Sequence, residues 1–363
     1  MNRRHMLIAG AGGAAAAATG GWLGWRGAVG SASAYERYSA ELRAPLPEDP
    51  PVLGLIRTAT LAASGHNTQP WRFRLSPGTI DLLPDLSRAT PVVDPDDHHL
   101  FVSLGCAAET LAIAGAATGR PGDFSTTPEG GLRYLYAAAP PQPDPLFAAI
   151  ARRQSTRALY DGRPVPNEAL ASLQQAGTRE GVRCVLLTER GRLDQLRDLT
   201  LAGNEAQMRD PAFLAELKHW LRFNPASAMR QGDGLYAAAS GSPTLPDWLG
   251  PRAFDLFVTP EAENEKYARQ IDSSPGIAIF FAEQADRAHW IAVGRACQRF
   301  ALAATARGLK LACLNQAVEV AALRRELAAL AGENGLRPDM VMRFGYGPTL
   351  PFAPRRPVAA VLA

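Results

Sequence analysis

Two polar stretches of the chain carry the residue types of one binding site divided in two. Residues 64–71 read Ser-Gly-His-Asn-Thr-Gln-Pro-Trp, and residues 153–157 read Arg-Gln-Ser-Thr-Arg. The first stretch offers neutral hydrogen-bonding groups beside an aromatic ring, whereas the second presents two arginines around a hydroxyl, a combination that suits a phosphate dianion. Neither stretch is complete alone, so we expect the fold to bring them together.

The two stretches together resemble the FMN-dependent nitroreductase family, and within it the tandem-repeat, exported branch known as Acg-like. In that family FMN lies at a dimer interface, with an Arg-x-Ser-x-Lys/Arg run from one subunit and a Ser-x-x-Asn-x-Gln-Pro-Trp run from the other. Here both runs lie in one polypeptide. The resemblance therefore implies an α+β, nitroreductase-like fold in which two fused, degenerate repeats form an intramolecular pseudo-dimer around one FMN.

The resemblance also implies a task for each matching residue. Arg153 and Ser155 would hold the phosphate and ribityl chain, and Arg157 would lie near the flavin pyrimidine edge, where a positive charge favours the anionic reduced flavin. The other implied cofactor-binding residues are Ser64, His66, Asn67 and Gln69 from the opposing half, Asn315 and Gln316 after the second repeat helix, and Arg355 and Arg356 as a closing phosphate clamp. Because the redox chemistry would belong to FMN, no side chain is assigned a catalytic role.

The chain departs from the family pattern at two places. Gly65 and His66 stand where family members more usually carry serine or threonine. The family's pyrimidine-contacting side chains have no match in residues 200–230. Residues 216–222, which end in Trp-Leu-Arg, either line the pocket or form an amphipathic helix over the flavin, and the sequence does not decide between the two.

Two alanine-rich segments indicate internal repetition. Residues 102–119 align without a gap on residues 291–308, and both copies carry small and apolar residues at helical spacing before a terminal glycine. The residues that recur are Gly105, Ala107, Ala112, Ala114, Ala117 and Gly119. A chance match between two alanine-rich helices is the alternative, but the complementary loss of motifs in the two halves argues against it. We therefore expect one packed helix in each half and a single FMN.

We divide the chain into a signal segment, residues 1–34, and two nitroreductase-like halves, residues 35–145 and 146–363. A proline-rich stretch at residues 137–145 has polyproline character and is expected to link the halves. A segment near residues 190–270 has no counterpart in the first half, which predicts an added helical subregion there.

The N-terminal residues have the composition of a twin-arginine export signal. Arg3 and Arg4 precede a weakly hydrophobic Ala/Gly stretch, and Ala32-Ser33-Ala34 offers small residues to a signal peptidase. That pathway moves folded proteins, which suits a chain that loads a cofactor before export. We expect an exported, periplasmic or extracytoplasmic protein that begins near Tyr35, with an uncleaved membrane anchor as the alternative.

Composition and charge argue against other classes of function. The chain has 363 residues, a net charge of +3 and scattered basic residues, so nucleic-acid binding has little support. The four cysteines form no CxxC pair, and most are expected to be buried free thiols. His98 and His99 are expected in a solvated loop or helix start, and no metal site is predicted.

The spacing of apolar residues predicts short strands alternating with helices. Strands are predicted at residues 71–75, 80–83, 182–187, 276–282 and 340–345. Helices are predicted at residues 194–208, 213–222, 287–307 and 320–330, and prolines at 45 and 164 introduce further helices that run to Ala63 and about Ala176.

Two functions of different classes fit these features. The first is an oxidoreductase that passes a hydride through FMN to a nitroaromatic, quinone or similar planar acceptor. The second is a flavin-holding protein of the Acg-like kind, in which the extra subregion covers the flavin and turnover is small or absent. Export removes the chain from cytoplasmic NAD(P)H, so the electron donor is left open. The other expected partner is the twin-arginine machinery, and the fused chain either suffices as a monomer or pairs with a second copy.

Overall fold

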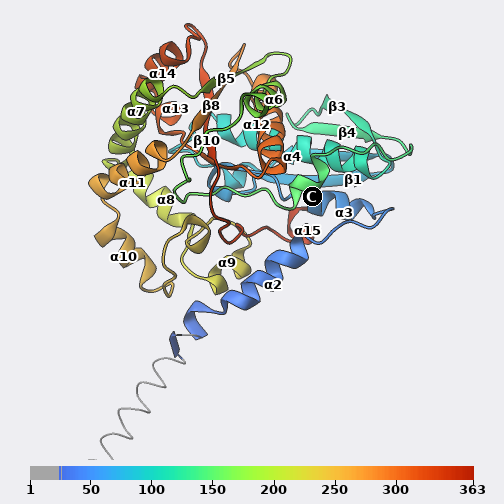
Figure 1. Ribbon diagram of the computed structural model, residues 1–363. Coiled ribbons are helices and arrows are strands. Elements are labelled where there is room, and N and C mark those ends of the chain that lie inside the picture. The colour runs from blue at the N-terminus through green and yellow to red at the C-terminus, as the bar shows by residue number, and fades with distance from the viewer. Residues whose placement is uncertain (1–23, 26) are drawn as a thin grey trace, which may run out of the picture.

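Two four-stranded antiparallel sheets, one in each half, organise the chain (Figure 1). The computed structural model describes residues 24–25 and 27–363, so most of the predicted signal segment lies outside the described residues. The first sheet contains β1 (Trp71–Ser76), β2 (Thr79–Pro84), β3 (Gly122–Thr126) and β4 (Leu132–Tyr136). The second sheet contains β5 (Val182–Leu187), β8 (Gly276–Ala282), β9 (Lys310–Cys313) and β10 (Pro338–Gly345).

The two sheets have the same strand order. The order is β1-β2-β4-β3 in the first and β5-β8-β10-β9 in the second, and neighbouring strands are antiparallel in both. In each half a long helix connects the second strand to the third, and a shorter helix precedes the first strand. The long helices are α4 (His98–Ala117) and α12 (Arg287–Ala306), and the shorter ones are α3 (Val52–Ala59) and α6 (Asn167–Gly177). The halves therefore repeat one α+β arrangement, as the sequence predicts.

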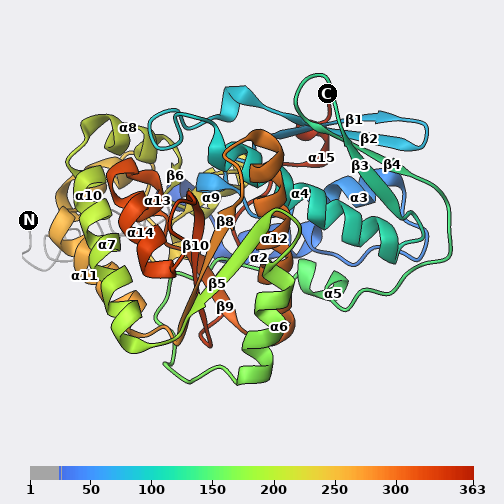
Figure 2. The ribbon, with the colours of Figure 1, turned by 90° about the horizontal axis from the view of Figure 1, so that it is seen from above.

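The long helices α4 and α12 cross in the middle of the molecule at two glycines (Figure 2). A Cβ atom on Gly105 would lie 2.0 Å from the carbonyl oxygen of Ile291, and one on Gly294 would lie 1.9 Å from that of Val102. Only glycine permits so close an approach of two backbones. Because Gly105 aligns with Gly294 and Val102 with Ile291 in the repeat, the contact is reciprocal, as it is across a twofold axis. The predicted pair of packed helices is confirmed.

The main hydrophobic core is continuous across both halves. Phe73 and Ile80 from the first sheet belong to the same buried cluster as Phe280 and Phe344 from the second. Among the described helices, α4 is long and apolar enough to cross a membrane, but most of it is buried in this core. The four cysteines are free thiols, and three of them are buried, as expected.

The segment between β5 and β8 forms the added helical subregion that the sequence predicts. It contains α7 (Arg190–Met208), α8 (Pro211–His219), β6 (Leu221–Arg222), α9 (Pro225–Gln231), β7 (Leu235–Tyr236), α10 (Gly250–Phe257) and α11 (Pro260–Asp272). In the first half, a tight turn at Gly78 joins β1 and β2 instead. The helix predicted to reach residue 222 ends at His219, because residues 221–222 pair in parallel with β7.

The C-terminal strap, residues 346–363, leaves the second half after β10 and ends on the first. It carries α15 (Val358–Val361), and Ala363 donates its backbone N–H to the carbonyl oxygen of Phe73 in β1 at 2.8 Å. The remaining helices are α2 (Ala32–Leu42), α5 (Phe147–Ile150), α13 (Gln316–Glu319) and α14 (Arg324–Ala331). Figure 1 shows the C-terminus beside β1 and α3, so the strap ties the two halves together.

Candidate functional site

Arg355 of the C-terminal strap connects the two predicted polar stretches. Its guanidinium donates to Asn67 Oδ1 at 2.9 Å and to the carbonyl oxygens of Leu61 and Ala62 at 3.1 Å each. Arg153 Nη2 donates to the same carbonyl oxygen of Leu61 at 3.1 Å. The stretch that contains Arg153 and the stretch that contains Asn67 therefore meet at one place, between the two halves.

The guanidiniums of Arg153 and Arg355 carry buried donors that no group of the described residues satisfies. Nε and Nη1 of Arg153 and Nε of Arg355 have no hydrogen-bond partner, and neither side chain forms an ion pair with a described carboxylate. Burial lowers the pKa of Arg153, and burial followed by repulsion from neighbouring arginines lowers the pKa of Arg355. An uncompensated buried charge is costly, and an anion placed here would offset that cost, so we call this place the candidate anion site.

The loop of residues 64–69 is strained. His66, Asn67 and Gln69 adopt positive φ angles of 44°, 53° and 53°, in the left-handed region that side chains other than glycine rarely occupy. Each such residue costs on the order of 1–3 kcal/mol, which surrounding contacts must offset. Ser64 contributes one contact, because its hydroxyl oxygen accepts the backbone N–H of Gln69 at 3.1 Å.

The amides of this loop are engaged by the added subregion and by the strap. Asn67 Nδ2 donates to the carbonyl oxygens of Gly234 and Pro354, both at 3.0 Å. Gln69 Nε2 donates to the carbonyl oxygen of Gly232 at 2.9 Å. The side chains predicted to touch a cofactor thus also hold the loop in its strained conformation.

The two adjacent arginines of the strap have different surroundings. Arg356 donates to the carbonyl oxygens of Gln69 at 3.0 Å and Trp71 at 3.3 Å and lies 3.7 Å from the carboxylate of Asp85. Protein groups therefore occupy much of its guanidinium, whereas Arg355 keeps a buried free donor. The structure places Arg355 at the candidate anion site and Arg356 at the strained loop.

Arg157 contacts the added subregion. Its Nη1 donates to Ser240 Oγ at 3.2 Å, and its carbonyl oxygen accepts Gln270 Nε2 at 2.6 Å. Burial, and then the charges of Arg157 and His99, lower the pKa of His66 to about 4. The imidazole of His66 therefore stays neutral at pH 7.

Three other predicted residues differ in what they offer to a ligand. Ser155 is exposed, and its backbone forms an isolated β-bridge with Leu311 of β9. Asn315 Oδ1 accepts the backbone N–H of Val341 at 3.0 Å, so this side chain fixes the end of β9 against β10. Gln316 is buried with its Oε1 unpartnered, which leaves an acceptor available.

His98 and His99 are buried, so the expectation of a solvated position is wrong, although α4 does begin at His98. His98 Nε2 lies 2.9 Å from Asp339 Oδ1, and Asp94 accepts the backbone N–H groups of His99 and Leu100 at 2.9 and 3.0 Å. Burial lowers the pKa of His98 to about 3 and raises that of Asp339 to about 6. Ligand atoms of Asp94, His98 and His99 lie within 4.8 Å of one another, but protein partners already engage both Asp94 oxygens and His98.

The Trp-Leu-Arg run, for which the sequence left open a pocket lining or an amphipathic helix over the flavin, is not helical. Trp220 is the C-cap of α8, and Arg222 lies in β6, where it pairs with Asp233 at 2.6 Å. Asp233 also pairs with Arg88, which donates to the carbonyl oxygen of Thr68 at 2.5 Å. Sequence reasoning missed Arg88 and Asp233, because neither lies in a family motif and their contact joins segments far apart in the chain.

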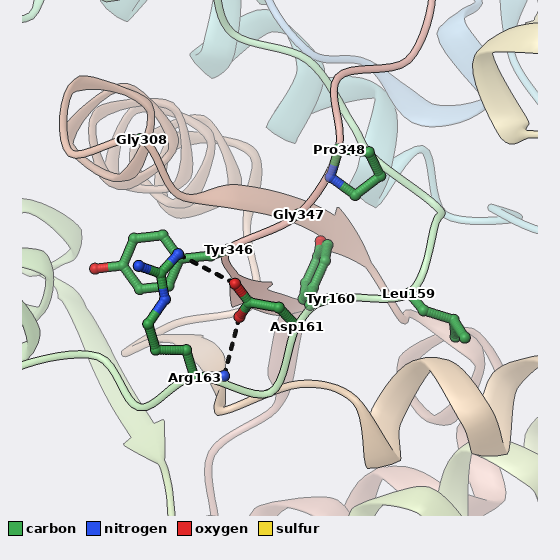
Figure 3. A pocket seen from close by; sticks show the side chains of 8 residues that line it. All are labelled: Leu159, Tyr160, Asp161, Arg163, Gly308, Tyr346, Gly347 and Pro348. Carbon is green, nitrogen blue, oxygen red and sulfur yellow. Dashed lines mark hydrogen bonds and ion pairs between the residues drawn. The ribbon is translucent and has the colours of Figure 1, made fainter.

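A surface pocket of about 490 Å³ lies elsewhere on the second half (Figure 3). Its lining residues are Leu159, Tyr160, Asp161, Arg163, Gly308, Tyr346, Gly347 and Pro348. The guanidinium of Arg163 lies 4.0 Å from the centre of the Tyr346 ring and pairs with Asp161 at 3.1 Å. The pocket contains none of the predicted cofactor-binding residues, so it is separate from the anion site.

The family model described as the nitroreductase family matches residues 150–346, more than half of the chain. The chain therefore belongs to the nitroreductase family. The matched region coincides with the second half of the structure, from α5 to the end of β10.

Curated relatives extend this likeness over both halves. The chain is 28% identical over 341 residues, 89% of its length and 94% of the relative, to "Putative NAD(P)H nitroreductase Rv3131" of Mycobacterium tuberculosis. It is 23% identical over 319 residues, 84% of its length and 93% of the relative, to "Putative NAD(P)H nitroreductase acg" of the same organism.

Solved structures give a weaker likeness. The FMN-dependent nitroreductase NfnB from Mycobacterium smegmatis, solved with NADPH, has a TM-score of 0.38 and 16% identity over 56% of this chain and 87% of that one. A nitroreductase with bound FMN from Desulfitobacterium hafniense has a TM-score of 0.37 and 15% identity over 59% of this chain and 94% of that one.

Proposed function

We propose that this protein is an FMN-binding oxidoreductase of the nitroreductase type, with one cofactor held between its two halves. The observation that carries the proposal is the set of buried, unpartnered donors on Arg153 and Arg355, with no carboxylate in the described part of the chain to neutralise them. A phosphate monoester fits this donor set, because it is a dianion with several strong acceptors. Membership of the nitroreductase family makes FMN the phosphate-bearing ligand to test first.

The residues of the site would divide the work of binding. Arg153 and Arg355 would bind the phosphate, Arg157 would supply positive charge beside the neutral His66, and Gln316 would offer its free acceptor. FMN, when bound, supplies two-electron hydride transfer to planar acceptors such as nitroaromatics or quinones. The strained loop of residues 64–69 would fix the boundary of the site, since its amides are held by the strap and the added subregion.

A second candidate is a flavin-holding protein with little or no turnover. One observation favours it: the added subregion reaches the loop of residues 64–69 directly, through Gly232 and Gly234 and through the Asp233–Arg88 pair. A subregion that lies against the site can cover a bound flavin and restrict access of a donor or acceptor. The same contacts are compatible with a reductase whose acceptor enters from another side.

Flavin content and anaerobic reduction test the two candidates. We expect protein purified without refolding to be yellow and to hold one FMN per chain. For a reductase, NADPH or NADH should bleach the flavin absorbance, and a nitroarene or quinone should restore it. Reduction by dithionite alone would support the flavin-holding candidate. A colourless protein that binds no added FMN would contradict both.

We also propose that the chain arose by fusion of two copies and is exported through the twin-arginine pathway. The identical strand order of the two sheets supports fusion. The expected cleavage residues, Ala32 to Ala34, form the first turn of α2, and the hydroxyl of the buried Tyr35 donates to the carbonyl oxygen of Phe352 at 2.7 Å. A peptidase acting on the folded chain would have to unwind this turn, which supports a retained anchor. Mass spectrometry of the native N-terminus tests this, and a chain that starts at Tyr35 would contradict retention.

A further inference from the structure

A third arginine, Arg43, lies beside the two that define the anion site. Arg43 is the C-cap of α2, and its Nη2 donates to the carbonyl oxygen of Ala353 at 3.4 Å. Arg355 Nη1 donates to the same carbonyl oxygen at the same distance. Arg153 and Arg355 in turn share the carbonyl oxygen of Leu61. The three guanidiniums are therefore linked in a row through two backbone oxygens.

Among residues 24–25 and 27–363, Arg43 has no acidic partner, as is also true of Arg153 and Arg355. Its guanidinium lies 4.0 Å from the centre of the Phe352 ring, and its Nη1 donates to Ser39 Oγ at 3.0 Å. Burial, together with the nearby charge of Arg153, lowers the pKa of Arg43 to about 10. Like charges held this close without a described carboxylate repel one another, and a bound anion would relieve that repulsion.

The helix that carries Arg43 is fixed to the C-terminal strap by two tyrosines. The hydroxyl of Tyr35 donates to the carbonyl oxygen of Phe352 at 2.7 Å, and that of Tyr38 donates to the carbonyl oxygen of Arg355 at 2.6 Å. The backbone N–H of Arg355 donates back to the Tyr38 hydroxyl at 3.2 Å. The position of Arg43 relative to Arg355 is thus set by direct bonds between α2 and the strap.

We propose that Arg43 is a third phosphate-binding arginine, so that the N-terminal helix α2 completes the site for a phosphate monoester. This inference rests on the proposed FMN site and adds to it a residue outside the two motif stretches and outside the matched region of residues 150–346. Arg153 comes from the second half, Arg355 from the strap and Arg43 from the segment next to the export signal. Phosphate binding would therefore require all three parts of the chain in place.

A comparison of FMN with riboflavin tests the proposal, because the two ligands differ only in the phosphate. The variants are Arg43→Gln, Arg43→Lys and the matched control Arg57→Gln. Arg57 donates to the carbonyl oxygens of Glu41 and Ala44 at 2.9 and 2.8 Å, so it supports the same end of α2 from outside the row of arginines. The measurement is the dissociation constant of each flavin for the apoprotein, from quenching of flavin fluorescence.

Arg43→Gln is expected to weaken FMN binding about tenfold, because one charge-assisted contact to the phosphate is lost. Riboflavin has no phosphate, so its binding should change less than about twofold. Arg43→Lys should recover most of the FMN affinity, since it keeps the charge. Arg57→Gln should leave the ratio of the two constants unchanged. Equal effects of Arg43→Gln on both flavins, or none on either, would overturn the inference.

A second measurement separates this inference from the proposed function. Inorganic phosphate should raise the melting temperature of the wild-type apoprotein, because a ligand that binds only the folded state stabilises it. The rise should be smaller in Arg43→Gln than in Arg57→Gln. If the wild type binds no flavin but shows this pattern, the FMN assignment fails and the role of Arg43 stands. Equal rises in both variants would remove that role.

Discussion

Two arginine clusters lie between the halves of this protein, and they differ in whether the protein neutralises them. In the first, which we call the phosphate cluster after its proposed ligand, Arg43, Arg153 and Arg355 have no described carboxylate partner. The second, which we call the Glu109 cluster, consists of Glu109, Arg179, Arg295 and Arg299. There the carboxylate accepts Arg295 Nε at 2.9 Å and Arg299 Nε at 2.6 Å, with Arg179 at 3.6 Å.

The difference separates an ion cluster that supports the fold from the cluster for which we propose an anionic ligand. Glu109 is only 2% exposed, in α4, and its arginine partners come from α12 and from the turn before β5. Each arginine of this cluster has an acidic partner, since all three approach Glu109 and Arg299 also lies 3.7 Å from Asp144. The cluster therefore stabilises the contact between the halves. In the phosphate cluster, Arg153 and Arg355 retain donors without a partner among the described residues, so we expect the cluster to cost stability in the apoprotein. We therefore expect the removal of one charge to lower the free energy of unfolding in the Glu109 cluster but not in the phosphate cluster.

The largest expected effect is on the Glu109 cluster. Glu109→Gln leaves two or three arginines facing a neutral amide in a buried site and should lower the free energy of unfolding by about 3 kcal/mol. Urea denaturation of the apoprotein measures this change. The ratio of the FMN and riboflavin dissociation constants should stay at the wild-type value. A loss below about 1 kcal/mol would mean that the cluster contributes no more than a surface ion pair.

Removing an arginine from the phosphate cluster should weaken FMN binding but leave the stability of the apoprotein unchanged or higher. Arg153→Met takes away a buried, uncompensated charge, so the stability of the apoprotein should stay level or rise by up to about 1 kcal/mol. FMN binding should weaken by roughly thirtyfold, or about 2 kcal/mol, whereas riboflavin binding should change little. Urea denaturation and fluorescence titration give the two quantities. An apoprotein destabilised as strongly as Glu109→Gln would break the distinction between the clusters.

The pH dependence of stability sharpens the comparison further. Burial alone would raise the pKa of Glu109, but Arg295 and Arg299 outweigh it and hold that pKa below its usual value near 4.5. A carboxyl with a lowered folded pKa contributes stability that is present above its unfolded pKa and is lost as the pH falls through the folded value. The stability difference between wild type and Glu109→Gln should therefore be constant above about pH 5 and shrink below about pH 4. Urea midpoints across this range test the sign, and a difference that grows on acidification would contradict it.

Much of the fold follows from the sequence because periodicity and paired glycines are local signals. The strands at residues 182–187 and 276–282 have the predicted bounds, and Gly105 and Gly294 mark the helix crossing. The strands β3 and β4 were missed, since β3 is short, polar and largely exposed. Its strand pairing depends on β4 rather than on an apolar pattern of its own.

The candidate site was less predictable, because contacts between distant segments decide what each polar residue does. Arg355 and Arg356 are adjacent and chemically identical, yet only one retains a buried free donor. His98 begins a helix as its sequence context indicates, but its burial comes from packing against Asp339, 241 residues away. Arg43 belongs to no motif, and its position depends on how the strap crosses the first half. Sequence spacing carries none of this information.

The smallest expected effect concerns Arg179, the outermost arginine of the Glu109 cluster. Its side chain is 32% exposed and lies 3.6 Å from a carboxylate that two nearer arginines already neutralise. A partly exposed, longer ion pair contributes little, so Arg179→Gln should change the free energy of unfolding by less than about 0.5 kcal/mol. Urea denaturation at low salt is the measurement. A cost as large as that of Glu109→Gln would show that the cluster needs all three positive charges, and its contrast with the phosphate cluster would then rest on geometry rather than on charge balance.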